Sequence, residues 1–157
     1  MASHELSMTV LMSPDMANFS GKVHGGALLK LLDQVAYACA SRHAASYVVT
    51  VSVDQVVFRQ AIHVGELVTF LACVNHVGAS SMEVGIKVIA ENIQTGQTRH
   101  VNSCFFTMVA MNEHGQKNNV PPLELRTPEQ QRRSRQAVLR RQLRKDLEAQ
   151  FASARQA

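Results

Sequence analysis

The chain has 157 residues, a hydrophobic fraction of 46% and a formal net charge of +4. These values predict one domain with a substantial apolar core. No apolar run reaches the roughly 18 residues of a membrane span. The N-terminus shows no secretory signal, so we expect a cytoplasmic protein without a membrane span. The three cysteines, Cys39, Cys73 and Cys104, are widely spaced and odd in number, which predicts reduced packing residues and no disulfide framework.

The first predicted element is a glycine-rich turn that leads into an apolar helix. Asn18, His24 and the Gly25-Gly26 pair precede this helix, which carries a single acid, Asp33. Glycines let backbone approach a ligand closely, and the free N–H groups of a first helical turn favour negative charge. A carboxylate in so apolar a helix costs free energy unless it is paired, faces a cavity or is functional. An anion-binding helix start near a carboxylate is typical of acyl transfer, where an oxyanion develops beside a base.

Four consecutive runs in the middle of the chain predict β-strands. They cover residues 47–58, 67–78, 82–93 and 98–112 and are separated by short polar or glycine-containing links. Strands joined by such short links are usually antiparallel neighbours. A helix that is apolar nearly all round must be enclosed, so these strands predict a curled antiparallel sheet around it.

Charge divides the chain into two parts. Residues 1–125 carry seven Lys/Arg and nine Asp/Glu, whereas residues 126–157 carry nine Lys/Arg and three Asp/Glu, which gives −2 and +6. We therefore predict a globular domain over 1–125 and a C-terminal helical extension over 126–157. A basic tail of this kind attracts nucleic acid, phosphates or an acidic neighbouring subunit, or it is a solvated helix face.

The C-terminal extension predicts a helix over 128–151. Thr127-Pro128-Glu129-Gln130 combines an N-cap hydroxyl, a proline at the first helical position and a glutamine three residues after the cap. A narrow apolar stripe follows at four-residue spacing: Leu139, Leu143, Leu147 and Phe151. So thin a stripe covers another surface poorly, and we expect the helix to serve assembly of subunits.

Short motifs follow one another in a definite order over residues 8–125. They are Asn18-x-x-Gly21-x-Val23-His24-Gly25-Gly26, Leu32-Asp33, Arg42-His43, Val49-Thr50-Val51-Ser52-Val53-Asp54, Phe58, Gly65, Val77-Gly78, Ser80-Ser81-Met82-Glu83-Val84 and Phe106-Thr107-Met108-Val109-Ala110. The ordered set resembles the hotdog-fold acyl-CoA thioesterases, both the small bacterial acyl-CoA hydrolases and the repeated domains of the mammalian cytosolic (brain-type) acyl-CoA hydrolase. The resemblance implies an α+β hotdog fold, with a long central helix wrapped by an antiparallel sheet, here followed by a basic helix. It also implies homodimers joined sheet edge to sheet edge, often as hexameric trimers of dimers.

The resemblance assigns Asn18 and Asp33 as a catalytic pair that meets across the dimer interface. Asp33 can act as general base on water or as a carboxylate nucleophile on the thioester carbon. Gly26, next to Gly25 at the helix N-terminus, offers its N–H as an oxyanion donor. Further substrate-binding candidates are His24, Thr50 and Ser52 near the site, Gly78, Ser80 and Ser81 along a CoA channel, and Arg42, His43, Arg59 and Arg99 for the CoA phosphates.

The sequence thus predicts an acyl-CoA thioesterase that releases a free fatty acid and CoA. It needs no cofactor, because coenzyme A is part of the substrate, and no metal: Cys39–His43 and His100–Cys104 lack further ligands at zinc-like spacing. One alternative is a hotdog dehydratase or hydratase, in which a histidine such as His24 works with an acid. Another is a non-catalytic acyl-CoA or nucleotide sensor; nucleic-acid binding is disfavoured because the basic tail has almost no aromatic residues.

Individual residues also have structural interpretations. Asn18 can simply end a turn, because asparagine suits turns. Asp33 can be a structural acid that is capped by a threonine or serine. His24, beside a glycine turn, is more often a structural hydrogen-bonding residue than a base.

Overall fold

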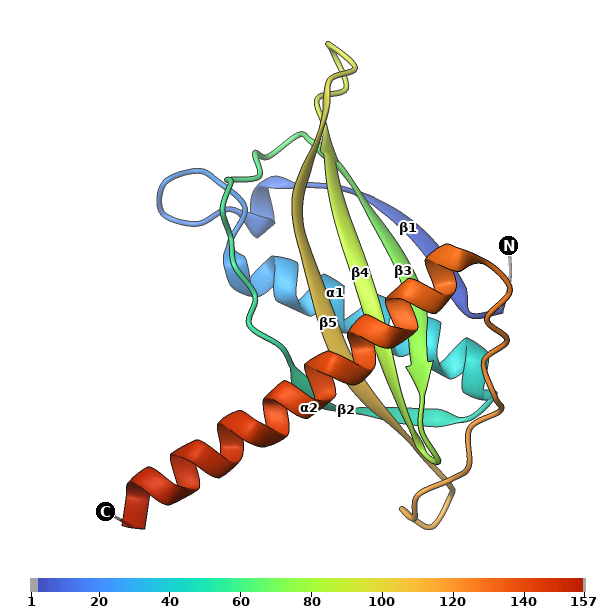
Figure 1. The fold of residues 1–157 in the computed structure, drawn as a ribbon. Coiled ribbons are helices and arrows are strands. Elements are labelled where there is room, and N and C mark those ends of the chain that lie inside the picture. The colour runs from blue at the N-terminus through green and yellow to red at the C-terminus, as the bar shows by residue number, and fades with distance from the viewer. Residues whose placement is uncertain (1–2, 157) are drawn as a thin grey trace.

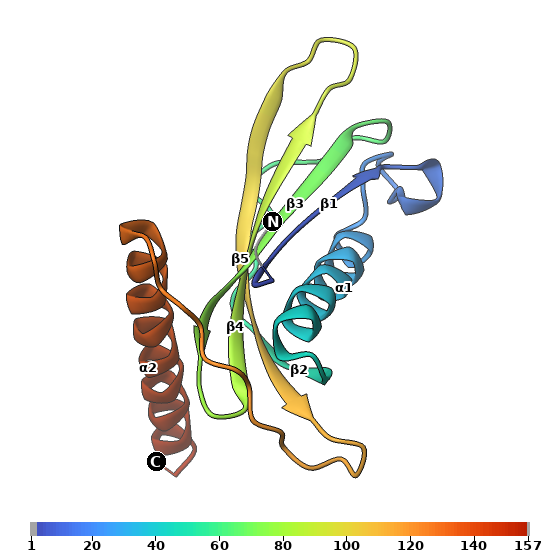
Figure 2. The ribbon, with the colours of Figure 1, turned by 90° about the vertical axis from the view of Figure 1, so that its right-hand side faces the viewer.

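The structure, a computed structural model, describes residues 3–156 and consists of a curved five-stranded antiparallel sheet with one long helix on each face (Figures 1 and 2). The strand order is β1-β3-β4-β5-β2, so β1 and β2 are the edge strands. In chain order the elements are β1 (Glu5–Leu11), the short 3-10 helix η1 (Pro14–Met16), α1 (Gly25–Ala44), β2 (Tyr47–Val53), β3 (Leu67–Val77), β4 (Ser81–Glu91), β5 (Thr98–Met111) and α2 (Pro128–Gln156).

The predicted antiparallel strands are confirmed, with two differences. The structure adds β1, which pairs with β3 in a region that the sequence presents only as a short N-terminal segment. The β2 strand ends at Val53, five residues before the end of the predicted run. The N–H of Asp54 still donates to the carbonyl of Phe105 at 3.0 Å, and the chain then leaves the sheet as a loop that leads to β3.

The inner face of the sheet carries α1 (Figure 2). The helix ends at Ala45, whose φ of 52° is left-handed and stops further helical hydrogen bonding. Its buried side chains pack against buried side chains of the sheet in one apolar core. Members of this core include Leu28, Leu32, Val35, Ala36 and Cys39 of α1 and Phe70, Val84, Phe106 and Met108 of the sheet.

One face of α1 stays uncovered within a single chain. Leu29, Asp33 and Tyr37, spaced four residues apart and therefore on one side of the helix, are all exposed. The predicted enclosure of the helix is thus incomplete, because five strands cover only one side of it. This uncovered face lies beside the edge strand β2, with which α1 is in contact.

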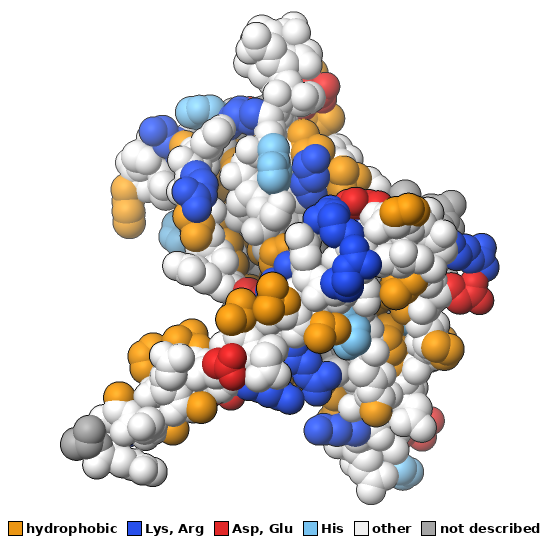
Figure 3. All heavy atoms as spheres, viewed as in Figure 1, with side chains coloured by type: hydrophobic (Ala, Val, Ile, Leu, Met, Phe, Trp, Pro, Cys, Tyr) orange, Lys and Arg blue, Asp and Glu red, His pale blue; other side chains and the backbone are white. Residues whose placement is uncertain are grey.

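The outer face of the sheet carries α2, which crosses the strands diagonally (Figure 1). The predicted cap is confirmed: the Gln130 N–H donates to Thr127 Oγ1 at 3.1 Å, and Gln130 Oε1 accepts the Thr127 N–H at 3.1 Å. The far end of α2 projects beyond the sheet, and hydrophobic side chains there are exposed to solvent (Figure 3). None of the helices within residues 3–156 combines the length and the apolar character that crossing a membrane requires.

Candidate active site

Asp33 and Thr50 meet in an open groove between α1 and β2. Thr50 Oγ1 donates a hydrogen bond of 2.6 Å to Asp33 Oδ1, which leaves Oδ2 of the carboxylate without a side-chain donor among the described residues. The groove has a volume of about 430 Å³. The rings of Tyr37 and Tyr47 stand edge to face in its wall, with centroids 6.2 Å apart. The carboxylate is therefore held in one orientation and is accessible to a ligand.

Asn18 lies in a tight loop that precedes α1. Its Oδ1 accepts three hydrogen bonds, from the Ser20 N–H at 2.9 Å, the Ser20 hydroxyl at 2.8 Å and the Lys22 N–H at 3.1 Å. Gly21 in the same loop has a φ of 79°, a conformation that glycine adopts readily. The structural interpretation of Asn18 is thus correct for its oxygen. With that oxygen fixed, its Nδ2 amide group is the part that can donate to a ligand.

The glycine turn before α1 is capped by a histidine. His24 Nδ1 accepts the Gly26 N–H at 2.9 Å, so the N–H expected to bind an oxyanion already has a partner. The neighbouring Gly25 N–H has no acceptor within residues 3–156. The Phe58 ring covers this turn, because a Cβ on Gly25 would lie 3.6 Å from the ring. Gly25 and Phe58, with Asn18 and Arg59, line a second pocket of about 300 Å³.

The two pockets are separate in a single chain. No residue lines both of them. Gly25 and Asp33 are eight positions apart on α1, which corresponds to about 12 Å at 1.5 Å per residue. One protomer therefore does not bring Asn18 and Asp33 together on its own.

The other candidates lie at different distances from these pockets. Arg59 lines the Asn18 pocket and forms no ion pair within the described part of the chain. Ser52 follows a register shift in β2 that separates it from Thr50. Arg42 donates to the carbonyl of Glu5 at 3.0 Å at the far end of α1, about 26 Å along the helix from the glycine turn. His43, also at that end, has its Nε2 3.0 Å from the carbonyl oxygen of Pro121.

The turn between β3 and β4 lies two strands away from the Asp33 groove within the sheet. Its Gly78 N–H donates to the Ser81 carbonyl, and the Ser80 carbonyl accepts an N–H from β5, both at 2.8 Å. Ser81 is paired with Val109 and Val109 with Val49, so two strand spacings, about 10 Å, separate Ser81 from the groove wall.

Arg99 is engaged in a partly buried ion pair with Glu66. Its Nη2 donates to Glu66 Oε1 at 2.8 Å and to the Ala61 carbonyl at 2.6 Å. The hydrogen bond from Arg99 holds the pKa of Glu66 below its usual range, and the same bond raises the pKa of Arg99. The guanidinium that the sequence offered to a CoA phosphate is thus occupied by a neighbour that the sequence analysis did not single out.

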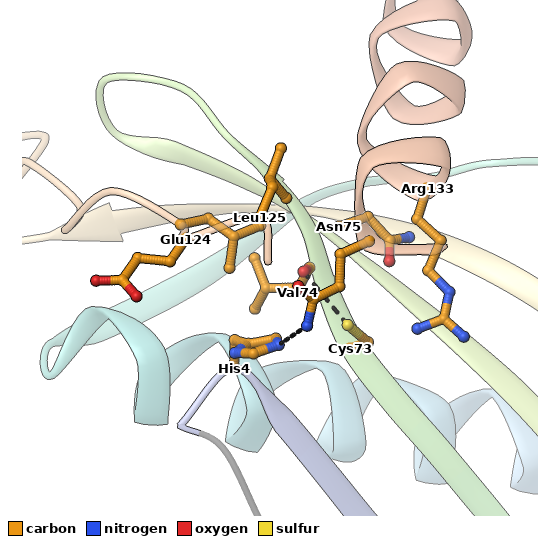
Figure 4. A pocket seen from close by; sticks show the side chains of 9 residues that line it. His4, Cys73, Val74, Asn75, Glu124, Leu125 and Arg133 are labelled. Carbon is orange, nitrogen blue, oxygen red and sulfur yellow. Dashed lines mark hydrogen bonds between the residues drawn. The ribbon is translucent and has the colours of Figure 1, made fainter. Parts of the chain in front are cut away.

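The cysteines lie away from both pockets; Cys39 and Cys104 are buried packing residues, whereas Cys73 is half-buried. Burial raises the pKa of Cys39 and of Cys104 to about 12 each, so neither is a thiolate at neutral pH. Cys73 lines a small pocket with His4 and Arg133 (Figure 4). This pocket has no space for a water-sized molecule. His4, Glu5 and Cys73 offer ligand atoms within 4.8 Å of one another, but the positive charge of Arg133 beside Cys73 opposes a cation there.

The sequence assigned no individual role to Tyr47, to Arg144 or to Asp54, the last residue of one of the quoted motifs. Tyr47 lies in the groove wall but is marked in the sequence only as the first residue of a strand. Asp54 and Arg144 form an ion pair at 2.9 Å although they are 90 positions apart, and no local pattern signals such a pair.

Comparison with known proteins agrees with this fold. Residues 20–97 match the family model described as the thioesterase superfamily. The chain is 49% identical over 140 residues to protein VdlD of Helicobacter pylori, which covers 89% of this chain and 80% of that protein. It is 33% identical over 129 residues to the human cytosolic acyl coenzyme A thioester hydrolase, which covers 81% of this chain but only 34% of that protein.

Solved structures match over nearly the whole chain. An apo-hexameric acyl-CoA thioesterase has a TM-score of 0.89 at 35% identity, with 94% of each chain covered. The acyl-CoA hydrolase of Staphylococcus aureus, solved with butyryl coenzyme A and coenzyme A, has a TM-score of 0.84 at 25% identity, with 99% of this chain and 96% of that chain covered. Structures of the same enzyme with an aspartate, an asparagine or a threonine replaced by alanine match as well.

The structure has a long helix held in a curled antiparallel sheet, and it matches solved acyl-CoA thioesterases. This architecture is the hotdog fold, which confirms the prediction from the sequence. The chain belongs to the thioesterase superfamily and is a thioester hydrolase of the acyl-CoA hydrolase type.

Proposed function

We propose that this protein hydrolyses acyl-CoA to a free fatty acid and CoA, with Asp33 as its essential carboxylate. The observation that carries the proposal is the 2.6 Å hydrogen bond by which Thr50 orients Asp33 in an open groove. A carboxylate that is oriented by one oxygen and accessible through the other is suited to act on water or on a thioester carbon.

Two routes use the same carboxylate. As general base, Asp33 takes a proton from water while the water oxygen attacks the thioester carbon, and the collapsing intermediate expels the CoA thiolate, which then takes up the proton. As nucleophile, Asp33 forms a mixed anhydride with loss of the CoA thiolate, and water then hydrolyses the anhydride. A single turnover in ¹⁸O-labelled water detects the nucleophilic route in which water attacks the Asp33 carbon of the anhydride, because the fatty acid then keeps the unlabelled bridging oxygen and Asp33 takes up the label.

The developing oxyanion requires hydrogen-bond donors. Among the groups at the glycine turn, we assign the Gly25 N–H and the Asn18 Nδ2 amide to this task. His24 uses the Gly26 N–H as a helix cap, and Asn18 Oδ1 is fixed by its own loop, so these two donors are the ones left to meet a ligand. His24 thereby acts as a positioning residue for the turn.

We further propose that the active site forms only in a homodimer. The Asn18 pocket and the Asp33 groove are separate in one chain, and both the uncovered face of α1 and the edge of β2 are available for a second copy. Isologous two-fold contact would place the Asn18 loop of one protomer beside the Asp33 of the other. The hexameric relative supports assembly of such dimers in threes. We also propose a cytoplasmic location, supported by the similarity to the human cytosolic acyl coenzyme A thioester hydrolase.

The alanine variants of the Staphylococcus aureus hydrolase add support. Their asparagine, aspartate and threonine have the same spacing along the chain as Asn18, Asp33 and Thr50 here. We also propose that Arg59, which lines the Asn18 pocket without an ion pair in the described chain, binds a CoA phosphate. Arg42, His43 and the β3–β4 turn would contribute to CoA binding only from the partner or through the assembly.

The test is incubation with saturated acyl-CoAs of rising chain length and a thiol reagent that detects free CoA. Hydrolysis releases one CoA per acyl group, whereas a dehydratase or hydratase releases none and a sensor binds without turnover. Asp33→Asn keeps the size of the side chain but removes the base, so we expect kcat to fall about 10²–10⁴-fold. A folded Asp33→Asn dimer with near wild-type turnover would exclude Asp33 as the essential carboxylate.

A further inference from the structure

The loop between β2 and β3 forms one wall of the Asn18 pocket. Residues 58–62 all line that pocket, and Phe58 covers the glycine turn. Most of the loop lies outside the sheet and is exposed, and only Ile62 within this stretch is buried. Apolar packing alone therefore gives the wall little support, and its position depends on what holds its two ends.

The first end is held from the opposite side of the sheet. Asp54, the first loop residue, accepts two hydrogen bonds from Arg144 Nη1 of α2, at 2.9 and 3.1 Å. Both side chains are largely shielded from solvent, with 18% of Asp54 and 27% of Arg144 exposed, which limits screening by water.

Arg144 is itself held by the preceding turn of α2. Arg140 donates to both carboxylate oxygens of the buried Glu83, at 2.6 and 3.0 Å, and its guanidinium lies 3.6 Å from the ring centre of Phe105. Residues four apart lie on one side of a helix, so Arg140 fixes the helix face from which Arg144 reaches Asp54.

The second end is held by the Arg99–Glu66 pair. Arg99 Nη2 donates to the Ala61 carbonyl at 2.6 Å, and Glu66 Oε1 accepts the His63 N–H at 2.7 Å. The next residue, Ile62, accepts the Val23 N–H at 2.8 Å, which joins the wall directly to the loop that carries Asn18.

We infer that Arg144 and Arg99 are positioning residues that clamp this pocket wall at its two ends, and that α2 thereby shapes a site on the opposite face of the sheet. The inference rests on the proposed function, because the clamped wall adjoins Asn18. Loss of either clamp would free Phe58 and Arg59 while leaving the Thr50–Asp33 bond in place. Substrate binding would then suffer more than the chemical step.

The experiment compares Arg144→Gln with Arg144→Lys and with the matched control Arg135→Gln. Arg135 is exposed on the same helix and forms no ion pair within residues 3–156, so its replacement removes the same charge without touching the clamp. Hydrogen–deuterium exchange of the Asp54 N–H, which donates to the Phe105 carbonyl at 3.0 Å, is measured first, because it needs no enzymatic activity. We expect faster exchange in Arg144→Gln, an intermediate rate in Arg144→Lys and wild-type exchange in the control.

Kinetics on the same variants test the link to the site. We expect KM for acyl-CoA to rise about tenfold in Arg144→Gln with kcat within about twofold of wild type. Asp54→Asn breaks the same ion pair through a substitution that lies outside α2. It should reproduce both effects, even if Arg144→Gln folds or assembles poorly. Wild-type exchange of the Asp54 N–H in both variants, or an equal change in Arg135→Gln, would overturn the clamp. Failure of the wild type to release CoA would refute the proposed function but leave the exchange result intact.

Discussion

Replacing Thr50 by valine removes one hydroxyl group from the candidate site and preserves the branched shape of the side chain. The lost hydroxyl donates to Asp33 at 2.6 Å. A hydrogen bond to a charged group contributes about 1.5–3 kcal/mol, and about 1.36 kcal/mol corresponds to a tenfold change in rate. If the bond serves to orient the base, kcat/KM of Thr50→Val falls about 10- to 100-fold. Because Asp33 is exposed to the groove, water replaces part of the lost bond, and we expect the lower half of this range.

The assay follows CoA release at saturating and limiting acyl-CoA. Thr50→Ser keeps the donor and should retain most of the activity. Thr107→Val serves as the control, because Thr107 lies on the neighbouring strand β5 and has no hydrogen bond to Asp33. A folded, dimeric Thr50→Val enzyme with kcat/KM within about twofold of wild type would refute the orienting role of this hydroxyl.

Three further predictions concern the dimer, pH and assembly. Inactive Asn18→Ala and Asp33→Ala dimers that are unfolded together and refolded should regain up to about a quarter of wild-type activity. The reason is that half of the randomly paired dimers are mixed, and each mixed dimer has one intact site. Mixed dimers without recovered activity would mean that both residues act within one chain. The pKa of Glu66 is lowered from 4.5 by Arg99, so this pair stabilises the fold above that pH and the contribution is lost as pH falls through the lower folded-state value. Glu66→Gln should therefore lower Tm at pH 7, and its difference from wild type should shrink as the pH falls below 4.5; an equal loss at every pH would contradict the linkage. Leu143→Gln with Leu147→Gln on the exposed stripe of α2 should reduce the oligomer size seen by light scattering, while the Asp54 N–H exchanges as in wild type. An unchanged oligomer size would show that the stripe is not part of the assembly interface.

Local patterns predicted most of the fold. The glycine turn, the helix that follows it, the antiparallel strands and the Thr127–Gln130 cap all follow from short-range chemistry, and the structure contains each of them. The same holds for Thr50, which the sequence placed on a strand near the site and which the structure pairs with Asp33. The assignments of Asn18 and Asp33 as a catalytic pair stay predictions, supported by the spacing seen in a relative.

What the sequence could not predict depends on contacts between distant segments. Arg99 and Arg42 look alike as free cations in the sequence, yet one meets Glu66 across 33 positions and the other a β1 carbonyl across 37. The sequence also predicted the Gly26 N–H as an oxyanion donor, whereas in the structure the His24 ring accepts this N–H. The sequence could not predict this contact, because a histidine at this position can either cap the helix or face a ligand. Only the three-dimensional arrangement decides between such uses.

The position of β2 at the edge of the sheet has a consequence for the solubility of the protein when its dimer dissociates. The strand Tyr47–Val53 contains no charge, proline or glycine, and Val51 and Val53 are exposed. Natural edge strands are usually blunted by such residues, and a bare, β-branched edge is a template for aggregation. In the proposed dimer the partner's strand seals this edge, so folding and pairing protect each other. A substitution that weakens the dimer would then deplete the protein through aggregation, without a stable pool of free monomers.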